Sequence, residues 1–272
     1  MTAPLGIIAG NGALPVLIAE ARRAAGKPVF IVGLQDAATP DIEKFDHVWL
    51  PVGHVQHAAE ALQKAGCREL LIIGGLSRPK LNESFDAGGR EIMKAALTQG
   101  AKGAAGILKL IVGYFERHGF TILPAESAYA DLVAPEGLLV GDIGDHEADI
   151  ALACKIARAI GQLDIGQGAV IRDGLVLCVE AQEGTDAMLA RAAELTEGET
   201  GGVLAKMPQP QQDRRLDLPA IGRRTVELAA AAKLAVIVFE ARGALLIGKD
   251  ACIAEAGQRG MFLLGVPAAT QD

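Results

Sequence analysis

Short apolar runs alternate with amphipathic segments along the first half of the chain. The run Leu5–Ala9 contains only apolar residues and glycine, which is typical of a buried strand. Further strands are predicted over Pro28–Val32, His47–Leu50, Glu69–Ile73 and Phe120–Leu123. Helices are predicted over Ala13–Ala25, His54–Ala65, Gly88–Gln99 and Gly103–His118. Strands separated by helices of this length indicate βαβ units and a mostly parallel sheet.

The pattern weakens over residues 134–146, where turn residues such as Pro135 and Gly137 interrupt it. A chain of 272 residues is long enough for about two domains. We therefore interpret residues 134–146 as a linker and hinge between an N-terminal domain, 1–133, and a C-terminal domain, 147–272.

The second half mixes helices with a predicted hairpin. Asp173-Gly174 joins the apolar runs Ala169–Ile171 and Leu175–Val179, and a tight turn of this kind needs positive φ. The other strands are predicted over Gly202–Lys206, Leu234–Phe239, Ala244–Ile247 and Met261–Leu264, with Ala244–Ile247 as the hairpin partner of Leu234–Phe239. The helices are predicted over Glu147–Ile160, Thr185–Leu195, Ile221–Lys233 and Asp250–Gln258. The composition and this mixture predict an α/β protein.

Acidic side chains gather where the second hairpin strand meets a helix. Glu180, Glu183, Thr185 and Asp186 fall within seven positions. Three carboxylates and a hydroxyl at such a junction can hold a hard cation, or face a phosphate through one. The alternative is local, with Thr185 as an N-cap and Asp186 in the first turn because the helix dipole favours an acid there.

The net charge and the positions of the cysteines argue against several classes of protein. The net charge is −7 and no basic cluster is visible, so we expect no nucleic-acid partner. The four cysteines are scattered without a metal-binding spacing, which favours buried free thiols in a reducing compartment. No signal peptide and no apolar run of roughly 18–20 residues is visible, so we expect a cytoplasmic protein.

A glycine turn follows the first predicted strand. Gly10, Asn11 and Gly12 precede a helix whose N-terminus favours an anion. Pro15 stands where a dinucleotide fingerprint has its third glycine, and Asp36 is a poor match for the ribose-binding acid. We interpret the turn as a nucleotide-binding element, and the alternative is a tight structural turn.

A second turn, Gly74–Pro79, follows the strand Glu69–Ile73 at the sheet edge where ligands bind in open α/β folds. Ser77 and Arg78 could hold a phosphate there, or Arg78 could simply be a surface residue. His54 and His57 lie three positions apart, and we interpret them as solvated helix residues without a catalytic role.

Asp217 lies between Arg215 and a proline-fixed turn, just before a predicted helix, with Lys206 upstream. A carboxylate in this setting can act as a base or a metal ligand. The alternative is an aspartate neutralised by Arg215 in a structural ion pair.

Several short motifs, in this order and spacing, resemble the LpxI-type UDP-2,3-diacylglucosamine pyrophosphatases of lipid A biosynthesis over essentially the whole chain. The motifs are residues 8–15, 74–79, 163–167, 179–189 and 212–222. The resemblance implies a Rossmann-like N-terminal domain with a mostly parallel sheet and a mixed α/β catalytic domain. It also implies Mg²⁺ and hydrolysis of the pyrophosphate of UDP-2,3-diacylglucosamine to lipid X (2,3-diacylglucosamine 1-phosphate) and UMP.

The family carries an aspartate that is essential for turnover, and it maps to Asp217. We place Asp217 and Glu180 in catalysis, and Asp217, Glu183 and Asp186 around the metal ion. The substrate-binding candidates are Gly10, Asn11, Gly12, Ser77, Arg78, Gln167, Thr185, Lys206 and Arg215. A UDP-linked diacyl lipid as the substrate allows contact with the inner face of the inner membrane, and a homodimer is a further expectation.

Two departures from the family bear on the substrate site. Relatives commonly carry Lys-Gly-Asp-Asp where this chain has Lys102-Gly103-Ala104-Ala105, and Gln209 stands where a lysine is frequent. The missing acidic pair keeps open a non-catalytic lipid- or nucleotide-binding protein. A nucleotide-dependent oxidoreductase is the other alternative, and it leaves the acids around Glu180 unexplained.

Overall fold

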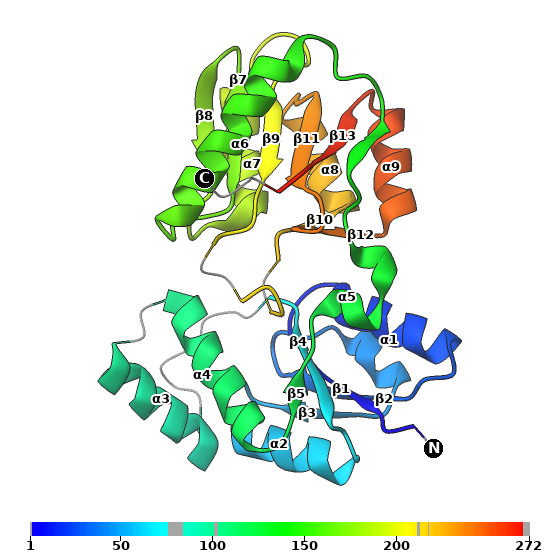
Figure 1. Cartoon of the computed structure of the whole chain (residues 1–272), viewed down its shortest axis with the longest axis vertical. Coiled ribbons are helices and arrows are strands. Elements are labelled where there is room, and N and C mark those ends of the chain that lie inside the picture. Colours follow the sequence, from blue (N-terminus) through cyan, green and yellow to red (C-terminus); the bar gives the residue numbers. More distant parts are fainter. Residues whose placement is uncertain (1, 76–83, 101–102, 211–212, 217, 269–272) are drawn as a thin grey trace. The chain divides into compact units, whose positions relative to one another are not determined.

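The computed structural model describes residues 2–75, 84–100, 103–210, 213–216 and 218–268. It contains two compact units, which are drawn in Figure 1. The first unit comprises residues up to Tyr129 together with Arg215 and Leu216, and the second comprises Ala130–Arg214 and the chain from Leu218 on. The α/β fold expected from the sequence is confirmed.

The first unit is built on a five-stranded parallel sheet in the order β3-β2-β1-β4-β5. Its strands are β1 Leu5–Ala9, β2 Val29–Leu34, β3 His47–Leu50, β4 Glu69–Ile73 and β5 Thr121–Ile122. Its helices are α1 Leu14–Ala24, α2 Val55–Lys64, α3 Ala87–Gln99, α4 Gly103–Arg117 and the short α5 Ala125–Ala128. The strand order reverses between β1 and β4, which is the Rossmann arrangement expected from the resemblance.

Apolar side chains of the central strands and of α2 and α4 form one large buried cluster of this unit. Ile8, Leu70 and Phe115 are buried in one cluster. Leu216, which comes from far along the chain, packs against the same cluster. Burial of β1 at every position explains why its sequence is apolar without alternation.

The second unit contains a six-stranded mixed sheet in the order β6-β13-β11-β9-β7-β8. Its strands are β6 Gly137–Val140, β7 Gly168–Arg172, β8 Leu175–Val179, β9 Val203–Lys206, β11 Val236–Glu240 and β13 Phe262–Val266. Its helices are α6 Glu147–Gln162, α7 Gly184–Leu195, α8 Arg223–Ala231 and α9 Lys249–Gln258. Strand β6 lies within the stretch expected to be a linker and pairs antiparallel with β13. The domain limits themselves stay a prediction.

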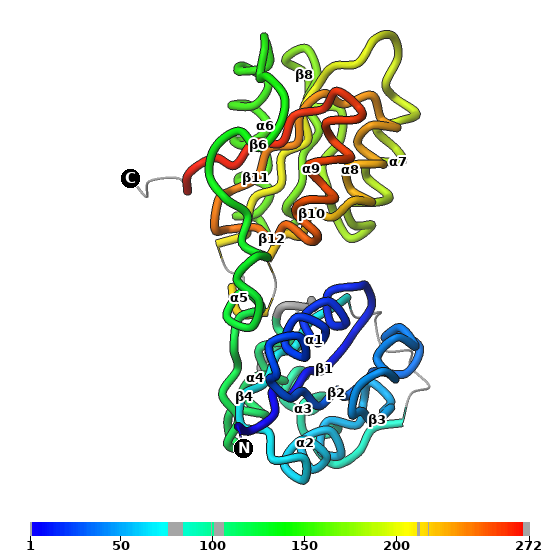
Figure 2. Tube along the Cα trace, turned by 90° about the vertical axis from the view of Figure 1, so that its right-hand side faces the viewer, coloured from blue at the N-terminus to red at the C-terminus, as the bar shows by residue number. Residues whose placement is uncertain are grey.

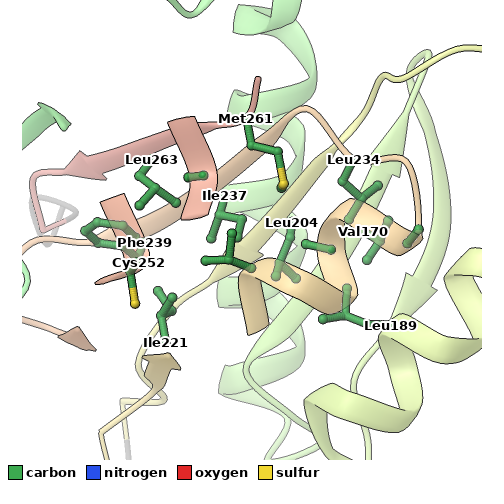
Figure 3. Packing of buried hydrophobic residues seen from close by; sticks show 14 of the residues in the cluster. Val170, Leu189, Leu204, Ile221, Leu234, Ile237, Phe239, Cys252, Met261 and Leu263 are labelled. Carbon is green, nitrogen blue, oxygen red and sulfur yellow. The ribbon is translucent and has the colours of Figure 1, made fainter. Parts of the chain in front are cut away.

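Two apolar clusters cover the two faces of this sheet. One is formed with α6 and includes Ala153 and Val236. The other is formed with α7, α8 and α9, and Figure 3 shows Leu189, Leu204 and Ile237 within it. The trace in Figure 2 shows α7, α8 and α9 beside one another in this unit. Helices on both faces bury the central strands, which explains the fully buried pattern of β9 and β11.

The predicted hairpin is confirmed. β7 and β8 pair antiparallel, and Asp173 and Gly174 adopt φ values of 51° and 75°. The Asp149 carboxylate of α6 accepts hydrogen bonds from the backbone N–H groups of Asp173, at 2.9 Å, and Gly174, at 2.8 Å. This contact fixes the turn to the first turn of the helix.

The predicted pairing of Ala244–Ile247 with Leu234–Phe239 is wrong. Strand β12, Leu245–Ile247, instead runs parallel to β10, Ala220–Gly222, in a separate two-stranded sheet. Residues 220–222 are extended and α8 begins only at Arg223, after the N-cap Gly222. The Leu245 N–H donates to the Pro219 carbonyl at 2.8 Å, so the chain leaves β11 for a distant partner and not for its neighbour.

Candidate functional site

A chain of hydrogen bonds joins three of the predicted site residues in the second unit. Glu180 directly follows β8, Thr185 lies in the first turn of α7, and Lys206 ends β9. Lys206 Nζ donates to Thr185 Oγ1 at 2.7 Å, and Thr185 Oγ1 donates to Glu180 Oε1 at 2.9 Å. Elements that are separate in the sequence therefore bring a lysine, a hydroxyl and a carboxylate together.

The two charged residues of this hydrogen-bonded group, Glu180 and Lys206, are both buried. The exposed fraction is 6% for Glu180 and 3% for Lys206. Lys206 Nζ also donates to the Ala220 carbonyl at 3.2 Å. Glu180 Oε2 is buried and has no hydrogen-bond partner among the residues that the structure describes. Because a buried carboxylate oxygen is costly without a partner, this atom is suited to accept from a donor or to bind a cation.

Close backbone approach around Glu180 depends on Gly168, which the sequence analysis did not single out. A Cβ atom at Gly168 would lie 2.5 Å from Glu180 Oε2, and the Glu180 N–H donates to the Gly168 carbonyl at 2.8 Å. Gly168 is also paired with Lys206 in the β7–β9 ladder. Gln167 precedes it and accepts from the Met207 N–H at 2.9 Å through its carbonyl, which places Gln167 beside the end of β9. The sequence signal is the pair of glycines around Gln167.

Glu183 and Asp186 are engaged elsewhere. Glu183 forms an ion pair with Arg191, and Asp186 forms one with Arg224, each at 2.6 Å. Within the described part of the chain, no group of three or more histidine, cysteine or acidic side chains is arranged to hold a metal ion. The spacing that placed these acids next to Glu180 in sequence does not make them converge with it.

The local alternative for Thr185 also differs from the structure. The N-cap of α7 is Glu183, whose side chain makes no capping bond, and Gly184 turns the chain with φ of 80°. The hydroxyl of Thr185 points instead to Glu180. Asp186 does lie in the first turn of the helix, as the dipole argument expects.

The acids expected near a magnesium ion would offer it one unpartnered oxygen among the described residues, Glu180 Oε2. Mg²⁺ is commonly held by one or two carboxylates together with phosphate oxygens and water. Glu180 would supply one such carboxylate, whereas Glu183 and Asp186 would first have to leave their arginines. The metal roles of these two acids stay predictions, and Asp217 lies outside the described residues.

The glycine turn of the first unit lies at the carboxyl ends of β1 and β4. The Asn11 N–H donates to the Gly75 carbonyl at 2.7 Å and the Gly75 N–H returns a bond to Asn11 at 3.0 Å. A Cβ at Gly10 would lie 2.5 Å from the Gly75 carbonyl oxygen, so close packing of two loops requires Gly10.

The same turn leaves polar groups open to a ligand. Asn11 and Gly12 are exposed, and the N-cap of α1, Ala13, offers no side-chain acceptor. The strand order reverses at this place, where open α/β sheets bind ligands. Ser77 and Arg78, predicted to act here, lie outside the described residues, and nucleotide binding by this turn stays a prediction.

Arg215 belongs to the first unit although it lies far along the sequence. Its Nη1 donates to Glu116 Oε1 of α4 at 2.9 Å. The alternative that Arg215 forms an ion pair with Asp217 is not tested, because Asp217 is outside the described part of the chain. A substrate-binding role for Arg215 stays a prediction.

The two histidines of α2 are partly solvated and hydrogen-bonded. His54 Nε2 lies 2.9 Å from Ser84 Oγ, and the two rings meet through their Nδ1 atoms at 3.3 Å. The backbone N–H of His57 donates to Asp86, the N-cap of α3, at 2.9 Å. These contacts give the pair a local role in joining α2 to α3.

All four cysteines are buried and free, as expected. Burial raises the pKa of Cys67, Cys154 and Cys252 to about 11. Thiols with such pKa values are poor nucleophiles near neutral pH.

The fold and site define a class: a two-unit α/β protein with a Rossmann-like first unit and a buried acid–hydroxyl–lysine chain in the second. Comparison with known families agrees, since the LpxI N-terminal domain matches residues 4–132 and the LpxI C-terminal domain matches residues 136–264. The chain belongs to the LpxI family, which confirms the resemblance seen in the sequence.

A curated relative covers nearly the same length. The UDP-2,3-diacylglucosamine pyrophosphatase LpxI of Caulobacter vibrioides is 42% identical over 271 residues, which is 96% of this chain and 97% of the relative. Among the described residues no helix is both long and apolar enough to span a bilayer.

Proposed function

We propose that this protein is a Mg²⁺-dependent hydrolase that cleaves the pyrophosphate of UDP-2,3-diacylglucosamine in lipid A biosynthesis. The products are 2,3-diacylglucosamine 1-phosphate and UMP. The observation that carries the proposal is the match to a relative named as this pyrophosphatase over almost the whole chain. The buried chain of Glu180, Thr185 and Lys206 supports it, because hydrolysis of a polyanion needs positive charge next to an oxygen base.

Positive charge is the first requirement of this reaction. A pyrophosphate repels an oxygen nucleophile until its charge is neutralised. Lys206 holds an ammonium group at the first turn of α7, where the helix N-terminus also favours an anion. A bound Mg²⁺ would add Lewis acidity toward the phosphate oxygens. We assign Thr185 and Lys206 to the phosphate end of the substrate, with Gln167 beside them.

The acid supplies the second requirement. In the proposed reaction, a water oxygen bonds to the α-phosphorus and the bond from that phosphorus to the bridging oxygen breaks. The bridging oxygen leaves with the lipid phosphate, and the water proton passes to a carboxylate. Asp217 is the proposed base or metal ligand. Glu180, with one oxygen held by Thr185 and the other without a partner, orients the water or a ligand.

The assignments that remain concern nucleotide binding, location in the cell and assembly, and they follow from the proposed substrate. We also propose that Gly10, Asn11, Gly12, Ser77, Arg78 and Arg215 bind the substrate, with the glycine turn as the nucleotide-binding element. A cytoplasmic enzyme with this lipid substrate works at the inner face of the inner membrane. A homodimer is part of the same proposal.

The test is thin-layer analysis of phosphate release from radiolabelled UDP-2,3-diacylglucosamine in detergent micelles, with and without Mg²⁺. We expect UMP and the lipid 1-phosphate only when Mg²⁺ is present, and near-complete loss of turnover in Asp217→Asn. Full activity of that variant removes Asp217 from the reaction. Full activity in excess EDTA refutes the metal requirement.

The missing acidic pair at Ala104-Ala105 favours one alternative, a protein that binds the lipid without cleaving it. Retention of the labelled substrate on the protein without product would support that alternative. An oxidoreductase is disfavoured by the family match, and unchanged NADH fluorescence on mixing with the protein would exclude it.

A further inference from the structure

Helix α3 presents an exposed face that is both apolar and basic. Arg90, Met93, Lys94 and Leu97 lie within an arc of about 100° at 3.6 residues per turn. Met93 is 36% exposed and Leu97 is 81% exposed. Ile92, on the opposite side of the helix, is buried in the core of the first unit. We refer to these four residues as the basic apolar face of α3.

The two apolar residues are unusual in their unit. Met93 and Leu97 are the large apolar side chains of the first unit that are exposed, within the part of the chain that the structure describes. They stand one helical turn apart on the same face. Single exposed apolar residues are ordinary, but a pair bordered by cations is typical of a helix that lies at a lipid–water boundary.

Of the two cations on this face, Arg90 has a local contact, since its Nη1 donates to the Phe85 carbonyl at 2.6 Å. Arg90 lies near the N-terminal end of α3, where the macrodipole disfavours a cation, and the last turn contains no basic residue. Lys94 has no ion-pair partner among the described residues. The neighbouring acid, Glu91, is neutralised by Arg117 at 2.8 Å. Two cations therefore lie beside the apolar pair, in a chain whose net charge is −7.

We propose that the basic apolar face of α3 binds the surface of an anionic lipid bilayer. Leu97 and Met93 enter the boundary between head groups and acyl chains, while Lys94 and Arg90 meet lipid phosphates. The inference rests on the proposed function, because a diacyl lipid substrate resides in a membrane. Two apolar side chains and two cations give weak, reversible binding that is sensitive to salt.

Sedimentation with vesicles tests this proposal on the full-length protein. Vesicles of phosphatidylcholine with about one third phosphatidylglycerol should bind the protein, and pure phosphatidylcholine should bind it far less. Leu97→Ser is expected to lower the partition coefficient about tenfold, and Lys94→Gln about fivefold. The matched control is Leu195→Ser at the end of α7, because Leu195 is 54% exposed but stands between Glu194 and Glu197. This control should bind as the unmodified protein does.

Equal binding of Leu97→Ser and Leu195→Ser would overturn the proposal. So would a change of oligomeric state by light scattering in Leu97→Ser alone, because the face would then be an interface between copies of the chain. Turnover in detergent micelles separates this inference from the proposed function. If Leu97→Ser shows normal turnover in micelles and unchanged vesicle binding, only the proposal about the basic apolar face is refuted. If the unmodified protein shows no turnover, the proposed function is refuted.

Discussion

Thr185 Oγ1 accepts a hydrogen bond from Lys206 Nζ at 2.7 Å, although the two residues lie 21 positions apart. Strands β8 and β9 both pair with β7, and α7 follows β8. The first turn of α7 can therefore reach the end of β9. Since the same hydroxyl donates to Glu180, one small side chain orients both buried charges. The predictions for the site begin from this residue.

Thr185→Val should damage both stability and turnover. The substitution removes the hydroxyl and leaves Glu180 Oε1 and Lys206 each with one hydrogen bond fewer. We expect the free energy of unfolding to fall by about 1–3 kcal/mol, as for a buried polar group that loses its partner. Urea unfolding and turnover in micelles measure the two effects. Thr185→Ser keeps the hydroxyl and should retain most of both, so equal loss in Ser and Val would contradict a role for the hydroxyl.

Glu180→Gln separates function from stability. The amide still bonds Thr185 but removes a buried negative charge with an unpartnered oxygen. We expect turnover to fall by about a hundredfold or more, with the free energy of unfolding unchanged or higher. The matched control is Glu240→Gln, because Glu240 is also buried but lies 3.8 Å from Arg158 in an ion pair. Glu240→Gln should lose stability and keep its turnover per folded molecule.

Gly10→Ala should destabilise the first unit. The new Cβ would lie 2.5 Å from the Gly75 carbonyl oxygen and 2.8 Å from that of Gly74, and backbone atoms there cannot turn away. We expect a loss of about 1–3 kcal/mol in the free energy of unfolding, measured by urea titration. Gly75→Ala is the control, since its Cβ would meet only Asn11 Cβ at 3.8 Å. Equal effects of the two substitutions would show that loop packing is not the cause.

Stability should fall at alkaline pH. The pKa of Cys67, Cys154 and Cys252 rises from 9.0 to about 11 on folding, because burial disfavours the thiolate. Above pH 9 the unfolded chain loses these protons before the folded chain does, so the free energy of unfolding decreases as pH rises toward 11. Urea unfolding at pH 8 and pH 10.5 measures the decrease. Replacing the three cysteines by alanine should flatten it, and an unchanged slope would assign it to other groups.

Hydrophobic pattern predicted most elements of both units, because buried strands are apolar at every position and the helices between them are amphipathic. It could not assign the partners of short strands. β10 and β12 have three residues each, too few for a pattern, and Ile221 continues the apolar spacing of α8. Their pairing includes the backbone hydrogen bond from Leu245 to Pro219, which joins residues far apart in the sequence and so leaves no local signal.

The site was predictable where its residues are neighbours in sequence. Glu180 and Thr185 were recognised together because they flank one turn. The same spacing suggested that Glu183 and Asp186 would join them. Spacing predicts that residues are near one another along the backbone, but it does not predict where their side chains point. Gly184, with φ of 80°, and the nearby arginines decide where those side chains point. Gly168 went unrecognised because its role is to leave space for Glu180, a residue distant in the sequence.

The return of Arg215 and Leu216 to the first unit has a practical consequence for anyone who wishes to study the halves separately. The polypeptide crosses from one unit to the other after Tyr129, comes back after Arg214 and crosses again before Leu218. A single cut near residue 130 therefore separates the N-terminal fragment from Arg215, which bonds Glu116, and from Leu216, which packs against its apolar cluster. After such a cut these contacts can form only between two separate fragments, because Arg215 and Leu216 belong to the C-terminal one.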